Sequence, residues 1–423
     1  MADVVALAEV WLWGTMVGAV AEEGNGRITF EYDPAFARQG LEISPFMLPG
    51  SVIGPITFPE LRRSDAFEGL PGVLADALPD RFGNAVIRRY YADRGRPDHV
   101  MRPVQKLLYI GDRAMGALTF RPPERIRTPA EEEPLEVARL VAQARVVIEG
   151  RPDVAIPEML RVGASAGGAR PKALILWSES TGRVRSGFAT PGAGDDHWIL
   201  KFDGVGELGA RDDTPKPFNR IEYAYARLAA HAGIDMPETR LLEQEGFGHL
   251  LVKRFDRMEG RRVHMHSLGG MQHVDYNIPA AFSYESFLRT ILRLTLGYPA
   301  LEEAFRRAVF NVVAVNQDDH VKNFAFLMSQ NGEWRLAPAY DLTFARGQGY
   351  TRTHQMTLNG KSDAFTRADL LAFGGTMGVN RDGRHVIDEV IEAMSHWREY
   401  AAEAGVPADR ITAVSDRFRL LSR

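Results

Sequence analysis

The chain has 423 residues, of which 45% are hydrophobic and 25% are charged. These fractions exclude a wholly disordered, collagen-like or coiled-coil chain, and the length predicts two to three domains at about 150 residues each. The net charge of −4 argues against a protein whose main role is to coat nucleic-acid backbones. The absence of cysteine excludes disulfides, thiolate metal sites and a cysteine nucleophile, and favours a reducing compartment.

The N-terminal apolar run, residues 4–20, is the one segment that could be mistaken for a targeting or membrane signal. Its first charge is Asp3, and Glu9 interrupts it, so it lacks the positive start of a signal peptide and the nearly uncharged length of a membrane helix. Its alternating side chains predict a strand packed on both faces, and turns at glycines lead into strands over residues 16–21 and 28–32. We therefore expect a β-meander and a cytoplasmic protein that makes no membrane contact.

A closing hairpin and a linker are predicted next. Residues 107–110 and 115–120 flank a turn at residues 111–113, which is typical of two paired strands. Residues 121–134 are rich in proline and charge, as a linker between domains would be. Residues 135–148 then predict a helix.

The middle of the chain is predicted to be mostly β-structure with one helix. Ile221, Tyr225, Leu228 and Ala232 belong to an apolar stripe at the helical period, and Gly233 closes it. The predicted strands cover residues 173–177, 187–190, 198–202, 239–242 and 250–252.

The last third of the chain is predicted to be helical. Residues 301–313 place apolar side chains at every third or fourth position, which indicates a helix packed against other helices. Residues 386–397 and 409–421 show similar patterns. A β-rich lobe followed by an α-rich lobe leaves a cleft at their boundary, and the fold class is α+β.

A glycine-rich segment and a strand lysine point to phosphate binding. Residues 163–172 read GASAGGARPK, and glycines let backbone N–H groups approach phosphate oxygens closely. The pattern matches neither GxGxxG nor GxxxxGK[ST], so a flexible turn explains it as well. Lys201 lies in the apolar strand WILKF and would neutralise phosphates beside a nucleotide. An outward-facing lysine on an edge strand is an equally good interpretation, and Glu222 is a candidate ion-pair partner.

The densest polar run follows the helix at residues 301–313. Residues 316–323 read NQDDHVKN, and so many polar groups are expensive to bury unless they serve a function. The interval from Asp318 to Asn323 is D-x-x-x-x-N, in which the aspartate accepts a hydroxyl proton and the asparagine holds Mg²⁺. The alternative is helix capping by Asn316 and an Asx turn built on Asp318 or Asp319.

Two further pieces complete an order that phosphoryl transfer requires. Asp341, in the sequence PAYDLT, is a candidate carboxylate ligand for a hard cation that bridges phosphates. Residues 251–257 read LVKRFDR and lie between the predicted lobes, where a connector would contact the adenine. Each piece alone also fits a turn or a strand end, but the order of phosphate loop, strand lysine, connector, D-x-x-x-x-N and metal aspartate favours a kinase.

In these residues the chain resembles the HipA family, the bacterial serine/threonine kinase toxins of type II toxin–antitoxin modules. The segment GDRAMGAL, at residues 111–118, also resembles the end of the family's N-terminal domain, so the resemblance extends across nearly the whole chain. The other matching segments are residues 165–172, 198–202, 254–257 (RFDR), 318–323 (DDHVKN) and 340–341 (YD).

The resemblance implies a fold with an N-terminal β-rich domain and a bilobal protein-kinase-like part. The kinase-like part would have a β-rich N-lobe and an all-α C-lobe. The implied divisions are residues 1–122 for the N-terminal domain, 123–160 for a linker and helix, 161–257 for the N-lobe and 258–423 for the C-lobe.

The resemblance also implies roles for individual residues. Asp318 is implied as the catalytic base, and Asn323 and Asp341 as ligands of Mg²⁺. Ser165 matches the serine that family members autophosphorylate, which silences the kinase. The residues implied to line the ATP site are Gly167, Gly168, Ala169, Arg170, Lys172, Lys201, Lys253, Arg254, Phe255, Asp256, His320, Lys322, Asn323, Tyr340 and Asp341.

Known members of the family phosphorylate aminoacyl-tRNA synthetases and pair with a small helix-turn-helix antitoxin of the HipB type, which binds operator DNA. Two departures from the family pattern stand out. Lys253 replaces an acidic residue in the connector, and Arg170-Pro171 replaces a Gln-Glu pair in the loop. A kinase-fold corepressor with weak catalysis and a small-molecule kinase remain alternative functions.

A group of histidines is a weaker candidate. His264, His266 and His273, together with Asp275, have a spacing that could hold zinc. A loop of exposed histidines is the preferred interpretation.

Overall fold

The computed structural model divides into two compact units. Unit 1 is Met1–Asn219 and Thr239–Met265, and unit 2 is Arg220–Glu238 and His266–Arg423. The structure describes residues 3–96, 98–124, 132–151, 156–162, 170–206, 214–376, 378–379 and 383–421.

Unit 1 begins with an antiparallel sheet in the strand order β3-β2-β1-β4. The predicted meander is confirmed as β1 (Val4–Leu12), β2 (Thr15–Glu23) and β3 (Ile28–Tyr32). The prediction that the first strand packs on both faces is wrong. Alternate residues such as Val10 are buried, whereas Leu7 is 53% exposed, because α4 (Pro103–Ile110) covers one face of the strand only.

The predicted closing hairpin is also wrong. Residues 107–110 are the last turn of α4, and Gly111 ends that helix with a positive φ of 58°. The strand β4 (Leu118–Arg121) pairs with β1 instead. A short apolar run fits a buried helix as well as a strand. The other helical segments of this part are α1 (Pro34–Ala37), η1 (Pro59–Arg63), α2 (Gly72–Ala75) and α3 (Arg81–Ala92).

The second sheet of unit 1 is antiparallel and five-stranded, in the order β6-β5-β7-β9-β8. The helix predicted over residues 135–148 is confirmed as α5 (Val137–Glu149), but the strand predicted at residues 187–190 lies earlier, as β6. The remaining elements are α6 (Pro157–Val162), β5 (Lys172–Trp177), β6 (Val184–Ser186), β7 (Asp196–Lys201), β8 (Thr239–Gln244), β9 (Phe247–Lys253), β10 (Arg257–Met258) and β11 (Arg261–Arg262).

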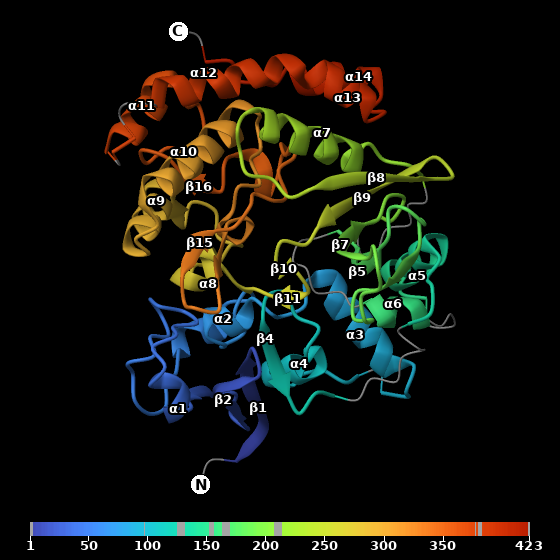
Figure 1. The fold of residues 1–423 in the computed structure, drawn as a ribbon, viewed down its shortest axis with the longest axis vertical. Helices are drawn as coiled ribbons and strands as arrows, with labels where there is room; N and C mark the ends of the chain where they lie inside the picture. Colours follow the sequence, from blue (N-terminus) through green and yellow to red (C-terminus); the bar gives the residue numbers. More distant parts are fainter. Residues whose placement is uncertain are drawn as a thin grey trace. The chain divides into compact units, whose positions relative to one another are not determined.

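Unit 2 is built around α10 (Gly297–Val313), which confirms the buried helix predicted over residues 301–313. Its neighbours α9 (Tyr284–Arg293) and α12 (Gly383–Ala393) pack against it, and Figure 1 shows α12 in red next to α10. The other helical segments are α7 (Phe218–His231, whose first two residues belong to unit 1), α8 (Leu268–Gln272), η2 (Val321–Asn323), η3 (Tyr350–Arg352), α11 (Arg367–Thr376), η4 (Met394–His396), α13 (Trp397–Glu403) and α14 (Ala408–Ser415).

The α+β fold class is confirmed, with one correction to the C-terminal part. This part is not all-α, because short strands complete it. The helix predicted over residues 386–397 is divided among α12, η4 and α13, and the last helix ends at Ser415. The short strands are β12 (His264–Ser267), β13 (Phe282–Ser283), β14 (Ala325–Met328), β15 (Trp334–Leu336) and β16 (Met356–Thr357).

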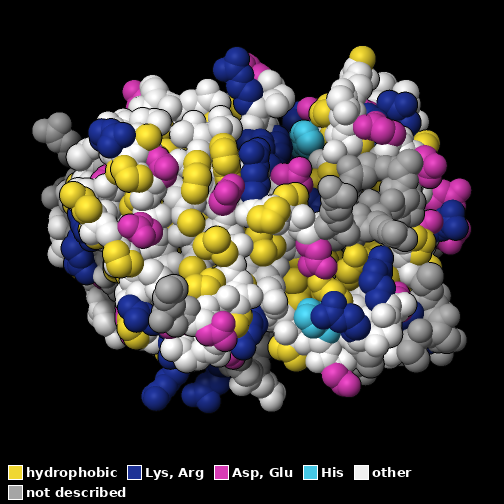
Figure 2. Space-filling model, turned by 90° about the horizontal axis from the view of Figure 1, so that it is seen from below, with side chains coloured by type: hydrophobic (Ala, Val, Ile, Leu, Met, Phe, Trp, Pro, Cys, Tyr) yellow, Lys and Arg dark blue, Asp and Glu magenta, His cyan; other side chains and the backbone are white. Residues whose placement is uncertain are grey.

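Two surface properties bear on function. Among the described residues, every helix is too short or too polar to cross a membrane. On the face that Figure 2 shows, basic and acidic side chains are interspersed among scattered hydrophobic ones. This mixture agrees with the small net charge of the chain.

Candidate active site

The polar segment after α10 is held by contacts that return the chain toward the helix. Val315 has a positive φ of 57°, so the chain turns sharply one residue later than the helix cap. The backbone N–H of Asn316 donates to the Asn311 carbonyl oxygen, and the side-chain nitrogen of Asn316 donates to Asn311 Oδ1, each at a distance of 2.9 Å. The cap residue of α10 is Ala314, and Asn316 contributes to the end of the helix through its hydrogen bonds to Asn311.

The buried carboxylate of Asp319 holds the polar segment in place through hydrogen bonds. This carboxylate accepts hydrogen bonds from the Tyr284 hydroxyl at 2.6 Å and from the Gln355 backbone N–H at 2.7 Å. The His354 ring lies against it, with Nδ1 2.8 Å from Asp319 Oδ2. The sequence gives no signal for Tyr284, His354 or Gln355, since each lies about 35 residues away along the chain.

Asp318 and Asn323 are joined by the main chain of the segment. Asn323 Nδ2 donates to the Asp318 carbonyl oxygen at 2.9 Å, and the Asn323 N–H donates to the His320 carbonyl at 2.9 Å. The five-residue interval therefore closes into a loop. The Asp318 side chain is 41% exposed, whereas that of Asp319 is fully buried, so the two adjacent carboxylates have opposite environments.

The side chain of His320, which belongs to this loop, lies among aromatic rings. Its ring centroid is 5.3 Å from that of Tyr276 and 6.4 Å from that of Tyr350. Burial lowers the pKa of the His320 imidazole to about 4, although the nearby Asp341 carboxylate acts in the opposite direction. The imidazole is therefore neutral at physiological pH and can act as a hydrogen-bonding group rather than as a cation.

Tyr340 and Asp341 join the same cluster. The Tyr340 hydroxyl donates to the Lys322 carbonyl oxygen at 2.7 Å, and Lys322 Nζ lies 5.0 Å from the centroid of the Tyr276 ring. Asp341 has a positive φ of 55°, a conformation that costs energy for a residue with a side chain. Unit 2 thus brings together six predicted residues: Asp318, His320, Lys322, Asn323, Tyr340 and Asp341.

In unit 1, two predicted lysines are direct neighbours in the sheet. Lys172 and Lys201 lie opposite each other in the β5–β7 pair, and both are buried. Opposite residues project from the same face of a sheet, about 5 Å apart, where like charges repel. Lys172 Nζ also lies 3.9 Å from Asp80 Oδ2. This face of the sheet is therefore suited to an anionic group.

Lys253 lies on the other face of the same sheet. It is the partner of Trp198 in the β7–β9 pair, and Trp198 is three residues from Lys201 in a strand whose side chains alternate. Its Nζ pairs with Asp196 Oδ2 at 2.7 Å and lies 5.7 Å from the Trp198 ring centroid. The side chains of Lys253 and Lys201 are not brought together.

Arg254 and Asp256 form a buried ionic cluster. Arg254 donates two hydrogen bonds to the Asp256 carboxylate, at 2.9 and 2.8 Å, and Arg257 donates a third at 2.7 Å. The Gly116 N–H also donates to Asp256, at 2.7 Å. The two guanidinium groups hold the pKa of Asp256 well below its usual range, against the effect of burial. These contacts connect the end of β9 to the N-terminal part of unit 1.

The other predicted residues of unit 1 are only partly described. Arg170 is exposed, and its guanidinium lies 4.2 Å from the Phe218 ring centroid. Phe255 is half-buried. Ser165, Gly167, Gly168 and Ala169 lie outside the described residues.

The histidines at the start of β12 are not an exposed loop, so that interpretation is wrong. His264 and His266 are fully buried, and His264 Nε2 lies 2.9 Å from the Ile43 carbonyl oxygen. His273 ends α8 in the left-handed conformation. Over the described ranges, no group of potential metal ligands gathers at these residues with Asp275.

Comparisons with known proteins agree along nearly the whole chain. The family model for the HipA-like C-terminal domain matches residues 164–398, and that for the HipA N-terminal domain matches residues 8–121. HipA in a Shewanella oneidensis complex of HipA, HipB and operator DNA has a similar fold. Its TM-score is 0.68 at 17% identity, and the match covers 98% of this chain and 96% of that one.

Two curated relatives carry the name "Putative kinase". One, from Haemophilus influenzae, is 25% identical over 264 residues, which is 53% of this chain and 76% of the relative. The other, Y4dM from Sinorhizobium fredii, is 24% identical over 365 residues, which is 80% of this chain and 77% of the relative.

Proposed function

Because the chain belongs to the HipA family, we propose that it is a toxin-type protein kinase. It would transfer the γ-phosphate of ATP to a serine or threonine hydroxyl of a protein. The family membership and the kinase names of the relatives support kinase activity, and the geometry of unit 2 supports the choice of residues. The observation that carries the proposal is the closed loop from Asp318 to Asn323, which is anchored by the buried carboxylate of Asp319.

Asp318 is the proposed catalytic base. Its side chain is half-exposed and emerges from a backbone that Asn323 and Asp319 hold in place. A carboxylate fixed in this way can orient a substrate hydroxyl for in-line attack and accept its proton. A loosely held aspartate would lose much of this advantage, because small displacements of a catalytic group reduce the rate strongly.

Asn323 and Asp341 are the proposed ligands of Mg²⁺. The amide nitrogen of Asn323 is engaged by the Asp318 carbonyl, which leaves the amide oxygen as the ligand atom. An amide oxygen and a carboxylate are the hard donors that Mg²⁺ prefers, and one or two such groups suffice when phosphates supply the rest. The residues therefore fit the ion, which would neutralise the charge of the transferring phosphate.

Lys172 and Lys201 are proposed to bind the phosphates of ATP. Two neighbouring ammonium groups on one face of the sheet fit a polyanion in a way that a single exposed lysine would not. Ile199, Val252 and Leu241 follow on the same face and are buried or half-buried, and such side chains suit the flat surface of an adenine. Lys253 would contribute through its backbone, since its side chain lies on the other face.

Regulation by Ser165 belongs to the same proposal. Autophosphorylation there would add about −2 charges to the glycine-rich segment and repel a bound triphosphate. We propose in addition that the chain is cytoplasmic and acts on an aminoacyl-tRNA synthetase. It would assemble with a HipB-type antitoxin, which would provide most of the contact with operator DNA.

Phosphoproteomics of cells that express the wild-type chain or Asp318→Ala tests this function. The wild type is expected to produce new phosphoserine or phosphothreonine sites on at least one protein, and these sites should be absent with Asp318→Ala. Identical phosphoproteomes would contradict the proposal. Retained binding of the antitoxin in that case would favour a corepressor without catalysis, and a phosphorylated metabolite would favour a small-molecule kinase.

A further inference from the structure

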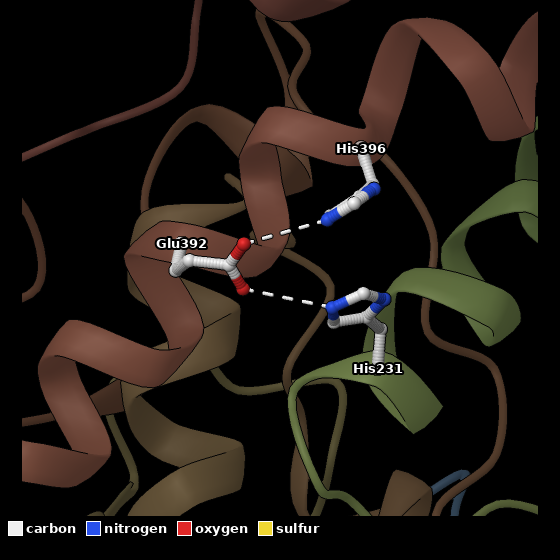
Figure 3. Close-up of side chains that lie close together, drawn as sticks. All are labelled: His231, Glu392 and His396. Atoms are coloured by element: carbon white, nitrogen blue, oxygen red, sulfur yellow. Dashed lines mark ion pairs between the residues drawn. The ribbon is translucent and has the colours of Figure 1, made fainter.

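In unit 2, three side chains that can bind metal ions lie close to one another, and none of them is among the residues assigned to phosphoryl transfer (Figure 3). His231 is the last residue of α7, Glu392 lies in α12, and His396 is the last residue of η4. We infer that these three residues form a binding site for a divalent transition-metal ion, and that Zn²⁺ fits it best. This inference is independent of the proposed kinase activity.

The distances within the cluster fit coordination better than hydrogen bonding. Glu392 Oε2 lies 3.6 Å from His231 Nε2, and Glu392 Oε1 lies 3.4 Å from His396 Nε2. Both distances exceed the usual hydrogen-bond range. Two ligand atoms of a tetrahedral zinc site, with bonds of about 2.0–2.2 Å, are about 3.4 Å apart. One ligand atom from each of the three residues lies within 4.8 Å of the others. The two imidazole rings lie against each other, with centroids 4.1 Å apart and planes 30° apart, so both rings would turn to direct Nε2 at one ion.

The outer nitrogens of both imidazoles already have partners. His231 Nδ1 lies 2.8 Å from the Tyr400 hydroxyl, and His396 Nδ1 lies 3.3 Å from Glu399 Oε2. For His396, the Glu399 carboxylate beside Nδ1 favours a proton on that nitrogen and leaves Nε2, which faces Glu392, as the nitrogen that would bind a metal ion. Metal-binding histidines are commonly oriented in this manner by a second group.

The charges around the cluster permit a cation. Arg227, one turn earlier on α7, stacks over the Tyr400 ring at 4.2 Å, but its guanidinium pairs with the Glu403 carboxylate. Glu392 and Glu399 add two negative charges beside the imidazoles. A divalent cation held by Glu392 would therefore meet a largely compensated environment.

The ligand set also determines which ion fits. Two imidazole nitrogens and one carboxylate suit Zn²⁺ and other late transition metals, whereas Mg²⁺ prefers oxygen ligands alone. Three protein ligands leave a further position for water or another donor. An ion bound here would also connect the end of α7 to the C-terminal helices and stabilise unit 2.

Isothermal titration of the metal-free full-length chain with Zn²⁺, in excess Mg²⁺ to occupy oxygen sites, tests the inference. The wild type is expected to bind one more Zn²⁺ than His231→Ala or His396→Ala. Glu399→Gln should bind Zn²⁺ about 10-fold more weakly, because it removes the partner of His396 Nδ1. Zn²⁺ should raise the melting temperature of the wild type but not that of His396→Ala.

His385→Ala is the matched control. His385 also pairs with a glutamate on α12, at 2.9 Å from Glu389, but it is 74% exposed and outside the cluster. Its replacement should leave the Zn²⁺ affinity unchanged. Circular dichroism would establish that each variant is folded. The inference fails if the wild type shows no saturable Zn²⁺ binding, or if both histidine variants bind Zn²⁺ as the wild type does.

Discussion

At the scale of single residues, the central feature is that the adjacent carboxylates of Asp318 and Asp319 lie in different environments and have different proposed roles. One carboxylate is half-exposed, and the other is buried among Tyr284, His354 and the Gln355 N–H. A buried carboxylate in a full set of hydrogen bonds fixes the backbone on either side of it. The neighbouring side chain is then held in position without being buried itself.

Asp319→Asn is expected to destabilise the fold by about 2–4 kcal/mol, because it removes a charged acceptor from a buried network. Asp318→Asn, one position earlier, should change the free energy of unfolding by less than about 0.5 kcal/mol, as is usual for a partly exposed residue. Urea denaturation of the two variants measures both values. Equal losses would contradict the assigned environments.

The burial of His249 predicts how the free energy of unfolding depends on pH. His249 is buried, its Nδ1 accepts a hydrogen bond from the Asp203 N–H at 3.0 Å, and burial lowers its pKa to about 4. The ordinary histidine pKa is about 6.5. Between these values the unfolded chain binds a proton that the folded chain does not, so the free energy of unfolding falls as pH decreases from about 6.5 to about 4.

His249→Gln should reduce this pH dependence by about 2–3 kcal/mol across that interval, since glutamine does not titrate. His197 has a similarly lowered pKa of about 4 and would maintain part of the slope. Denaturation midpoints measured at several pH values provide the comparison. An unchanged slope in the variant would show that His249 is not responsible.

At the scale of elements, the pairing of β5 with β7 determines which lysines can act together. The register places Lys172 opposite Lys201, and the alternation of β7 directs Lys253 to the other face. Lys201 and Lys253, which the family resemblance places in the same site, therefore have different neighbours.

Lys201→Met is expected to weaken ATP binding by about 10–100-fold, the loss expected for a charged hydrogen bond to phosphate. Lys253→Met is the matched control, because its side chain pairs with Asp196 on the opposite face, and it should change the dissociation constant by less than about twofold. Calorimetric titration with ATP distinguishes them. Equal losses in both variants would place the nucleotide elsewhere.

The elements were predictable where one strong periodicity covered many residues. The long stripe of α10 and the alternation in β1–β3 agree with the structure. Short apolar runs led to wrong predictions. Residues 107–110 form the end of a helix instead of a strand, and the strand predicted from residue 187 begins three residues earlier. β6 pairs with the neighbouring strand β5, so its error concerns only the boundary of the strand, whereas a short apolar run such as residues 107–110 fits a helix as well as a strand.

At the scale of the whole molecule, the small net charge of the chain predicts how tightly it binds DNA. Alone, it should bind an operator duplex only weakly, with a dissociation constant no tighter than about 10⁻⁶ M at physiological salt. Addition of the proposed HipB-type antitoxin should produce a tight complex that contains both proteins. Fluorescence anisotropy of a labelled duplex measures each case, and tight binding by the chain alone would contradict the prediction.

The motif residues of the candidate site could be predicted from sequence, whereas their supports could not. Asp318 and Asn323 lie in one short polar stretch, and Asp341 is indicated by the family pattern. Unit 2 brings all three residues together. Tyr276 and Tyr350, which flank His320, come from a turn and from the short helix η3, and neither carries a local signal. The network around Asp319 depends on long-range contacts that only the folded chain creates.

The most direct measurement of the central claim is transfer of labelled γ-phosphate by the purified chain and by Asp318→Asn, with ATP affinity measured in parallel. If Asp318 is the base, the variant should lose about 10²–10⁴-fold in transfer rate while its affinity for ATP stays within about threefold of the wild type. Normal transfer by Asp318→Asn would contradict the proposed mechanism.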